Sequence, residues 1–311
     1  MLSTDNVRGA AFMSVAMAGF VLNDTMMKLV FARLDLFQAI FLRGLLLALL
    51  LGLLALPRRE LLHRPSRRDR RILTLRVLGE IGSAVCFLTA LYHMPIANAT
   101  AIIQVIPLAI TLAAAMVFGE KVGWRRYSAI AVGFAGVMII VRPGAEGFDA
   151  YAIWAVVAVG FMVLRDLSTR RLSTAIPSLY VAFVTAILTA GFAGAVALTR
   201  EWQPLAPREL GLLTASAGFL VFGYLFSIKA MRVGEVAFVS PFRYTILIWA
   251  IVLGIAVFGD IPDGWTLTGA AVVVATGIYT FYRERKLMRA VAQAAVQTAE
   301  GVSAAPRTLG E

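Results

Sequence analysis

The chain is poor in charge, in cysteine and in histidine. Only 15% of its 311 residues are Asp, Glu, Lys or Arg, and 60% are hydrophobic, whereas soluble domains carry roughly 25% charged residues. The single cysteine, Cys86, excludes a disulfide within the chain and any site built from several cysteines. The two histidines, His63 and His93, are too few for a metal site. A surface so poor in charge predicts lipid as the solvent.

Motifs for nucleotide chemistry and hydrolysis are also missing. The sequence contains no P-loop, no dinucleotide-binding glycine pattern and no Gly-x-Ser-x-Gly turn. We therefore expect no bound cofactor, no metal and no ATP-driven step within this chain, and we do not expect an enzyme.

Long apolar runs are what the sequence has in abundance, with a mean hydropathy of +0.82. A helix needs about 20 apolar residues to cross a bilayer. The runs predict an all-α integral membrane protein with ten transmembrane helices, near 10–31, 36–56, 72–92, 96–118, 127–142, 150–166, 177–198, 210–230, 236–258 and 266–282.

The net charge of +11 is unevenly placed along these helices. With the N-terminus in the cytoplasm, 21 of the 29 Lys and Arg residues fall on the cytoplasmic side, and only Arg33, Arg142, Arg200 and Arg208 fall outside. This asymmetry is typical of bacterial inner-membrane proteins with both termini in the cytoplasm. It assigns the basic loops to orientation and lipid headgroups, not to nucleic acid.

An internal repeat divides the chain into two halves. At an offset of 140, Val117-Phe118-Gly119-Glu120 aligns with Val257-Phe258-Gly259-Asp260, and Thr100 aligns with Ser240. At an offset of 142, the pattern of Asn23, Asp24 and Lys28 recurs as Arg165, Asp166 and Arg170. Because each half has five spans, the two repeats must be inserted with opposite orientation, an architecture recurrent in secondary transporters. We place the first repeat at 8–142, the second at 150–285, and a cytoplasmic, disordered tail at 286–311.

Charged residues inside the spans are costly, so we expect them to face the bundle interior. Asp24 and Lys28 are four residues apart, as are Arg76 and Glu80 and the repeat-related Asp166 and Arg170, so each pair shares a helix face. These six residues are candidates for gating or coupling. Asp24–Lys28 is a latch between the halves, a direct contact to substrate or proton, or a pair that serves only during insertion. Glu80 is the best candidate for a proton-coupling carboxylate.

Two arginines, Arg43 and Arg243, have no acidic residue within a helical turn. Each either binds an anionic group of a substrate or pairs with an acid on another helix. Arg243 follows Pro241, which removes a backbone donor and is expected to break the helix. Pro107, three residues after Gln104, is expected to act in a similar way. Near these positions, the aromatic side chains of Tyr92, Tyr244 and Trp249 either stack on a planar substrate or serve only packing. The predicted substrate-binding set is Arg43, Arg243, Tyr244, Trp249, Gln104 and Tyr92.

These motifs carry a resemblance to a known family. The loop Phe-Gly-Glu-Lys at 118–121 and the segment Gly-Phe-Ala-Gly-Val at 133–137 resemble the EamA branch of the drug/metabolite transporter superfamily. The resemblance covers nearly all of 8–285. The Asn23-Asp24-x-Met26-x-Lys28, Pro241-Phe242-Arg243-Tyr244 and 262–270 segments are similar to bacterial S-adenosylmethionine uptake transporters.

This resemblance implies a secondary carrier of a small zwitterion, S-adenosylmethionine- or amino-acid-like, with the lipid bilayer as its surroundings and protons or exchange as the driving force. A riboflavin carrier, or another importer or exporter of the superfamily, remains an alternative. So do a membrane-embedded enzyme for lipid-linked substrates, and a channel or sensor. The sequence leaves a homodimer open.

Overall fold

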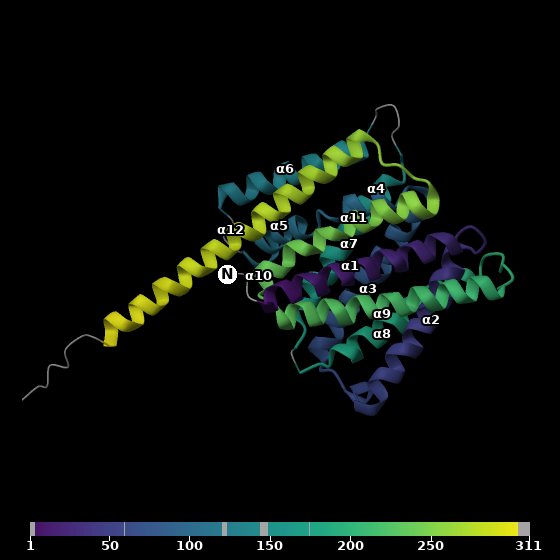
Figure 1. Ribbon diagram of the computed structural model, residues 1–311. Coiled ribbons are helices and arrows are strands. Elements are labelled where there is room, and N and C mark those ends of the chain that lie inside the picture. Colours follow the sequence, from purple (N-terminus) through teal and green to yellow (C-terminus); the bar gives the residue numbers. More distant parts are fainter. Residues whose placement is uncertain (1–3, 59, 120–122, 144–148, 174, 304–311) are drawn as a thin grey trace, which may run out of the picture.

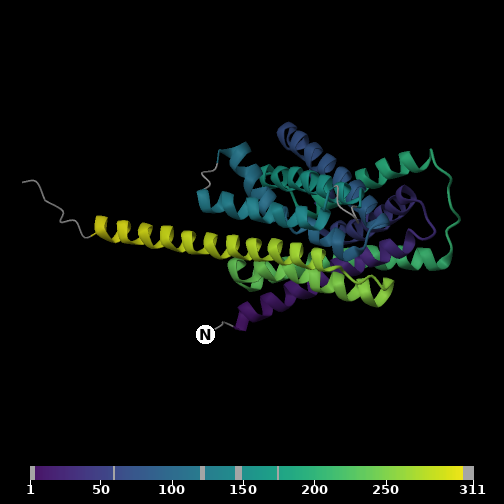
Figure 2. The same ribbon diagram turned by 90° about the horizontal axis from the view of Figure 1, so that it is seen from above.

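The computed structural model describes residues 4–58, 60–119, 123–143, 149–173 and 175–303, and these residues contain helices and turns but no strand. The helices form one bundle, with α12 projecting well beyond it (Figures 1 and 2). Nine helices among the described residues are long and apolar enough to cross a membrane, and Tyr127–Val141 is a shorter apolar helix. This is a multi-pass membrane protein, and its helices coincide with the ten predicted spans.

The elements follow one another as antiparallel passes. The first half comprises α1 (Thr4–Val30), α2 (Leu36–Ala55), two 3-10 turns, η1 (Leu56–Arg58) and η2 (Glu60–Leu62), α3 (Arg67–His93), α4 (Ile96–Ile103) with α5 (Ile106–Phe118), and α6 (Trp124–Val141). The second half comprises α7 (Ala152–Arg171), α8 (Ser178–Ala197), α9 (Pro207–Val233), α10 (Val236–Val239), η3 (Ser240–Tyr244), α11 (Thr245–Leu253), η4 (Gly254–Phe258) and α12 (Gly264–Ser303). The predicted tail is helical over residues 286–303, where α12 continues to Ser303, and not disordered there. The disorder of 304–311 stays a prediction, because these residues lie outside the described part of the chain.

The helix packing follows the predicted two-fold relation between the halves. Helix α1 packs on α9 while the related α7 packs on α3, and the related pairs α2–α8 and α6–α12 pack on each other. Each of these four contacts joins a helix of one half to a helix of the other. The halves are therefore interleaved and share one hydrophobic core.

Glycines allow two of these contacts to be very close. A Cβ on Gly79 of α3 would lie 2.7 Å from the backbone nitrogen of Arg165 in α7. A Cβ on Gly223 of α9 would lie 3.2 Å from the carbonyl oxygen of Ala16 in α1. Small residues that let backbones approach are the usual means of helix association in lipid, where apolar burial gives little driving force.

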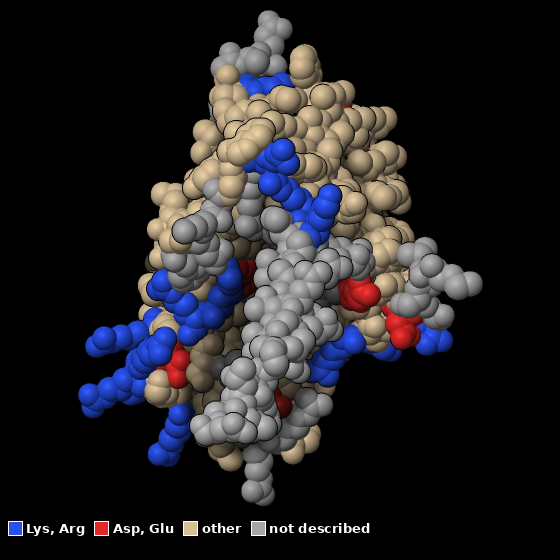
Figure 3. Space-filling view, turned by 90° about the vertical axis from the view of Figure 1, so that its left-hand side faces the viewer, with Lys and Arg blue, Asp and Glu red and all other residues tan. Residues whose placement is uncertain are grey.

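We call the side where α1 begins and α9 ends the termini face, and the side where α1 ends and α9 begins the opposite face. Lys and Arg side chains gather on the termini face, from which α12 protrudes (Figure 3).

Candidate functional site

A central cavity of about 620 Å³ lies where the two halves meet. It occupies the part of the bundle nearer the termini face. It gathers charged and polar side chains from six different passes, namely Asn23, Asp24, Arg43, Glu80, Gln104, Arg165, Asp166, Arg170, Arg243 and Tyr244. Most of the predicted site residues are therefore brought together.

Two broken helices supply part of this lining. Helix α4 ends at Ile103, and α5 restarts at Ile106 with Pro107 in its first turn, so that Gln104 lies in the break. In the second half, Pro241 lies in the 3-10 turn η3, which carries Arg243 and Tyr244. Both predicted helix breaks are confirmed. Irregular backbone at membrane depth is tolerated where it borders a cavity, as it does at both breaks.

In the first half, Asn23 holds the polar lining together. Its side-chain oxygen accepts hydrogen bonds from Arg43 Nη1 at 3.3 Å and from the Ser216 hydroxyl at 2.8 Å, and its Nδ2 donates to Asp24 Oδ1 at 2.9 Å. Asp24 and Glu80 also interact electrostatically with Arg43. Arg43 is thus oriented by a neutral amide with two carboxylates nearby.

In the second half, Arg165 links two carboxylates. Its Nη1 lies 3.6 Å from Glu80 Oε2, and its Nε donates to Asp166 Oδ1 at 2.7 Å. The sequence places Arg165 with the cytoplasmic arginines and does not predict that it pairs with two carboxylates at the cavity. The internal repeat could have indicated this role, because Arg165 and Asp166 align with Asn23 and Asp24. Both pairs of residues line the cavity.

The charged partners differ from those that helical spacing predicts. Arg76 donates to the hydroxyls of Thr169, at 3.1 Å, and Thr185, and Glu80 pairs with Arg165 instead. Spacing of four residues puts two side chains on one face, but a neighbour on another helix can lie closer.

Lys28 also finds its partners across the bundle. It donates to the carbonyl oxygen of Met94 and lies 3.9 Å from Asp260, at the opposite face. Asp166 pairs with Arg165, and Arg170 lines the cavity. Asp260 and the nearby Asp263 pair with different segments of the first half. Asp260 pairs with Lys28 of α1, and Asp263 pairs with Arg142, the residue that follows α6.

Two predicted aromatic residues lie outside the central cavity. Tyr92 is 42% exposed near the opposite face, beside Phe31 and His93. The indole nitrogen of Trp249 donates to the carbonyl oxygen of Ser14 at 3.2 Å. Of the three predicted aromatics, only Tyr244 lines the cavity.

Arg243 and Tyr244 have unused polar groups. Within the described part of the chain, the Arg243 guanidinium makes no hydrogen bond or ion pair, and the buried Tyr244 hydroxyl has no hydrogen-bond partner. An unused arginine in a cavity is available to a ligand anion. No group of three or more His, Cys, Asp or Glu side chains among the described residues is arranged to hold a metal.

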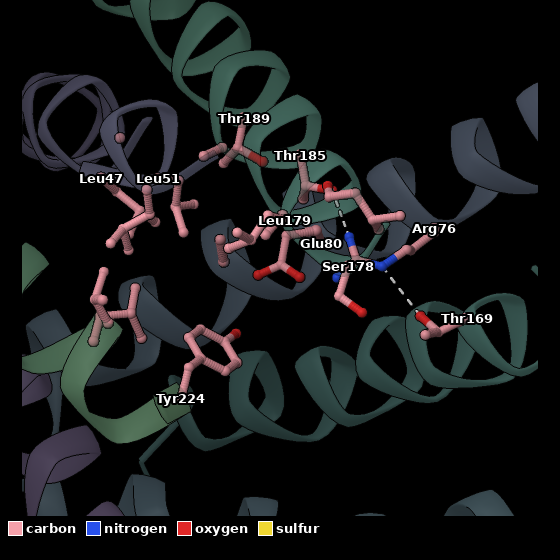
Figure 4. A pocket seen from close by; sticks show the side chains of 18 of the residues that line it. Leu47, Leu51, Arg76, Glu80, Thr169, Ser178, Leu179, Thr185, Thr189 and Tyr224 are labelled. Carbon is pink, nitrogen blue, oxygen red and sulfur yellow. Dashed lines mark hydrogen bonds between the residues drawn. The ribbon is translucent and has the colours of Figure 1, made fainter. Parts of the chain in front are cut away.

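A second cavity of about 590 Å³ adjoins the first, between α2, α3, α8, α9 and the end of α7 (Figure 4). Arg43, Glu80 and Tyr224 line both cavities. Sequence reasoning did not single out Tyr224. The only available signal was the repeat, which pairs Tyr224 at an offset of 140 with Ala84, another residue that lines both cavities.

Comparison with known protein families shows which family has this arrangement. The model of the EamA-like transporter family matches residues 7–142 and again residues 150–282. The chain belongs to the EamA-like transporter family. The resemblance noted in the sequence is confirmed, and the bundle is the membrane fold of the family with two inverted repeats.

Similar EamA-type proteins include several named carriers. An S-adenosylmethionine uptake transporter of Rickettsia conorii is 28% identical over 62% of this chain and 66% of its own length. A riboflavin transporter of Vibrio cholerae is 32% identical over 69% of this chain and 72% of its own length. The pseudopaline exporter CntI of Pseudomonas aeruginosa is 27% identical over 64% of this chain and 72% of its own length.

The match to the S-adenosylmethionine transporters thus covers slightly less than two thirds of their length. The names of the family and of these relatives are those of transporters, not enzymes. A solved crystal structure also shares the fold, with a TM-score of 0.62 at 18% identity, covering 89% of this chain and 98% of that chain.

Proposed function

We propose that this chain is a secondary transporter of the bacterial inner membrane that carries a small zwitterionic metabolite, similar to S-adenosylmethionine or an amino acid. The observation that carries the proposal is one cavity that offers both signs of charge. Arg243 has a guanidinium there with no partner among the described residues, and the carboxylates of Asp24, Glu80 and Asp166 share the same space. In a site partly shielded from water, such groups select a ligand with complementary charges.

Alternating access fits the shape of the cavities. Both cavities lie toward the termini face, whereas cross-half contacts such as Lys28–Asp260 lie at the opposite face. The basic residues on the termini face support placing both termini in the cytoplasm (Figure 3). The structure then corresponds to an inward-open state, and Lys28 and Asp260 belong to the gate that must open outward.

Proton coupling would use the carboxylates that exchange partners during this movement. Glu80 is the stronger candidate because its ion pair with Arg165 joins α3 to α7, so a movement between these helices would change its partner. Asp24, hydrogen-bonded to Asn23 on its own helix, is the second.

The first test is a thermal-shift screen of the purified protein against amino acids, S-adenosylmethionine, nucleosides and riboflavin. A ligand that binds the folded state raises its apparent stability by mass action, by about 2.7 kcal/mol at a hundred times its Kd. We expect a shift with S-adenosylmethionine or an amino acid that is lost in Arg243→Ala. Arg232→Ala is the matched control, because it removes an exposed arginine at the end of α9 outside both cavities.

The outcomes separate the candidate substrates. A shift with riboflavin alone would favour the function named for the Vibrio cholerae relative. The absence of a shift with every amino-acid-bearing compound would refute the zwitterion proposal. In proteoliposomes loaded with the ligand found, collapse of the proton gradient should abolish uptake if protons drive transport.

A further inference from the structure

The second cavity differs chemically from the central one. Its walls are mostly leucine, isoleucine and alanine side chains of α2, α8 and α9. Its polar groups are largely hydroxyls, from Thr169, Ser173, Ser178, Thr185 and Thr189, together with the ring of Tyr224 (Figure 4).

Each charged residue of this second cavity already has a partner, although the buried Nε of Arg43 has none among the described residues. Arg76 donates to the Thr169 and Thr185 hydroxyls, Glu80 pairs with Arg165, and Arg43 donates to Asn23. The space therefore offers apolar surface, an aromatic ring and hydroxyl groups. An uncharged group with hydrogen-bonding substituents would fit it better than a free charge would.

Tyr224 stands at the border of the two cavities. Its side chain is 48% exposed, and it lines both spaces. Its ring packs edge-on against Phe20, which lines the central cavity, at 5.4 Å and 81°. In Figure 4 the ring lies in the second cavity, on the side across from Thr185 and Thr189.

Each cavity separately reaches the volume of roughly 300–1,000 Å³ found for sites of drug-sized ligands. Two such spaces with a shared wall suit one ligand with two unlike ends. The charged end would meet Arg243 and the carboxylates, and the uncharged end would pass Tyr224 into the second cavity.

We propose that the second cavity is a selectivity compartment that takes an uncharged, planar, hydroxyl-bearing group of the ligand, of the nucleoside class, with Tyr224 as the stacking residue. This inference rests on the proposed function for the charged end only. A planar group can stack on the exposed Tyr224 ring, while one of its hydroxyls can bond to Thr189, whose buried hydroxyl has no partner among the described residues. Stacking of a base on an aromatic side chain typically contributes about 1–3 kcal/mol, so its loss should weaken binding about tenfold.

The test measures the affinity of the purified full chain for three probes by titration calorimetry. L-Methionine represents the charged end alone, adenosine the uncharged end alone, and S-adenosylmethionine both. We expect Tyr224→Ala to weaken adenosine and S-adenosylmethionine about tenfold and to leave L-methionine unchanged. Tyr224→Phe, which retains the ring, should bind all three probes as the parent does. Tyr92→Ala is the control, because Tyr92 is an exposed tyrosine outside both cavities.

A second variant fills the compartment instead of removing its ring. Ala182 of α8 lines the second cavity but not the central one. Ala182→Trp should exclude adenosine and retain L-methionine, whereas Arg243→Ala should do the reverse. Thermal unfolding of each variant, compared with the parent, verifies that it is folded.

Each outcome decides between the two proposals. If adenosine binds in a Tyr224-dependent manner and neither amino-acid probe binds, the compartment stands and the zwitterion function fails. If Tyr224→Ala weakens L-methionine as much as S-adenosylmethionine, the cavities are one undivided site and the compartment is refuted. Adenosine that fails to bind, or that binds equally to Tyr224→Ala and Ala182→Trp, overturns it as well, and binding of none of the three probes overturns both proposals.

Discussion

The two faces of the bundle differ in what lies between the two halves. At the opposite face, ion pairs and hydrogen bonds tie the first half to the second, at Lys28–Asp260, Arg33–Glu209, Arg142–Asp263, Asp35–Arg200 and Gln38–Gln203. At the termini face, the cross-half contacts among the described residues include hydrogen bonds from backbone amides, from Ser173 to Asp69 and from Glu235 to Asn6. Both cavities lie on this second side.

This difference indicates which face of the bundle is closed and which face adjoins the cavities. Ionic contacts across one face and cavities toward the other are what the proposed alternating access requires of one of its two states. Arg165 lies between the two faces, joining α3 to α7, and Lys28 lies on the closed side.

The largest expected effect is a loss of stability when the contacts of Arg165, which lies between the two faces, are removed. Arg165→Ala leaves the carboxylates of Glu80 and Asp166 without their cation inside the bundle, which typically costs about 3–5 kcal/mol. The thermal midpoint of the purified protein should fall strongly, and Glu80→Gln with Asp166→Asn in the same chain should restore much of it. Arg8→Ala is the control, because Arg8 is exposed and its 3.9 Å pair with Asp5 should contribute under about 1 kcal/mol. Equal effects of the two arginine substitutions would contradict the assigned role of Arg165.

Opening the closed face should have the next largest effect. Lys28→Met removes the contacts to Met94 and Asp260, and a hydrogen bond from a charged group typically contributes about 1.5–3 kcal/mol. The population open at that face should therefore rise about tenfold or more. The readout is labelling of Gln104→Cys, in a Cys86→Ser chain, by an impermeant maleimide added to spheroplasts or to inverted vesicles.

The parent should label from the termini face, and Lys28→Met should add labelling from the opposite face. Arg208→Met serves as the control, because Arg208 is an exposed arginine at the same face, in the first turn of α9. Unchanged labelling in Lys28→Met would show that this lysine does not hold the gate.

The smallest effect concerns pH at the closed face. Burial would raise the pKa of Asp263, but hydrogen bonds from Thr266 and Arg142, and the charge of Arg142, hold that pKa below its usual value. The folded protein then binds this proton less readily than the unfolded chain does. The stabilisation is present above the unfolded pKa of about 4 and is lost as the pH falls through the lower, folded value.

Because the Asp263 side chain is 44% exposed, this contribution should be only a few tenths of a kcal/mol. Unfolding measured between about pH 5 and pH 3 should show a shallower decline for Asp263→Asn than for the parent. An identical decline in the two chains would remove Asp263 from the contacts that close this face.

Much of the fold could be predicted from the sequence because lipid imposes strong rules on it. Apolar length located the passes, and Pro107 and Pro241 located the two breaks. The costs of burying charge also indicated that Asp24, Arg43 and Glu80 face the interior, and all three line the central cavity.

The partners of these charges could not be predicted in the same way. Helical spacing gives the face of a side chain, whereas the distance from Arg165 to Glu80 or from Lys28 to Asp260 depends on how separate helices pack. Tyr224 was missed for a related reason, since a tyrosine in an apolar helix gives no sign of whether it faces lipid or a cavity.

The interleaving of the two halves has a consequence for biosynthesis. The close contact between Ala16 and Gly223 joins residues separated by more than 200 positions, so α1 leaves the ribosome long before its packing partner α9 exists. At roughly 5–20 residues per second, α1 spends about 10–40 s in the membrane without that partner. During this interval Asp24 and Lys28, four residues apart on one helix face, are the only residues of α1 with an opposite charge within one turn of each other in the later half of the helix. The pairing that the finished bundle gives up in favour of Asp260 is thus suited to the nascent chain.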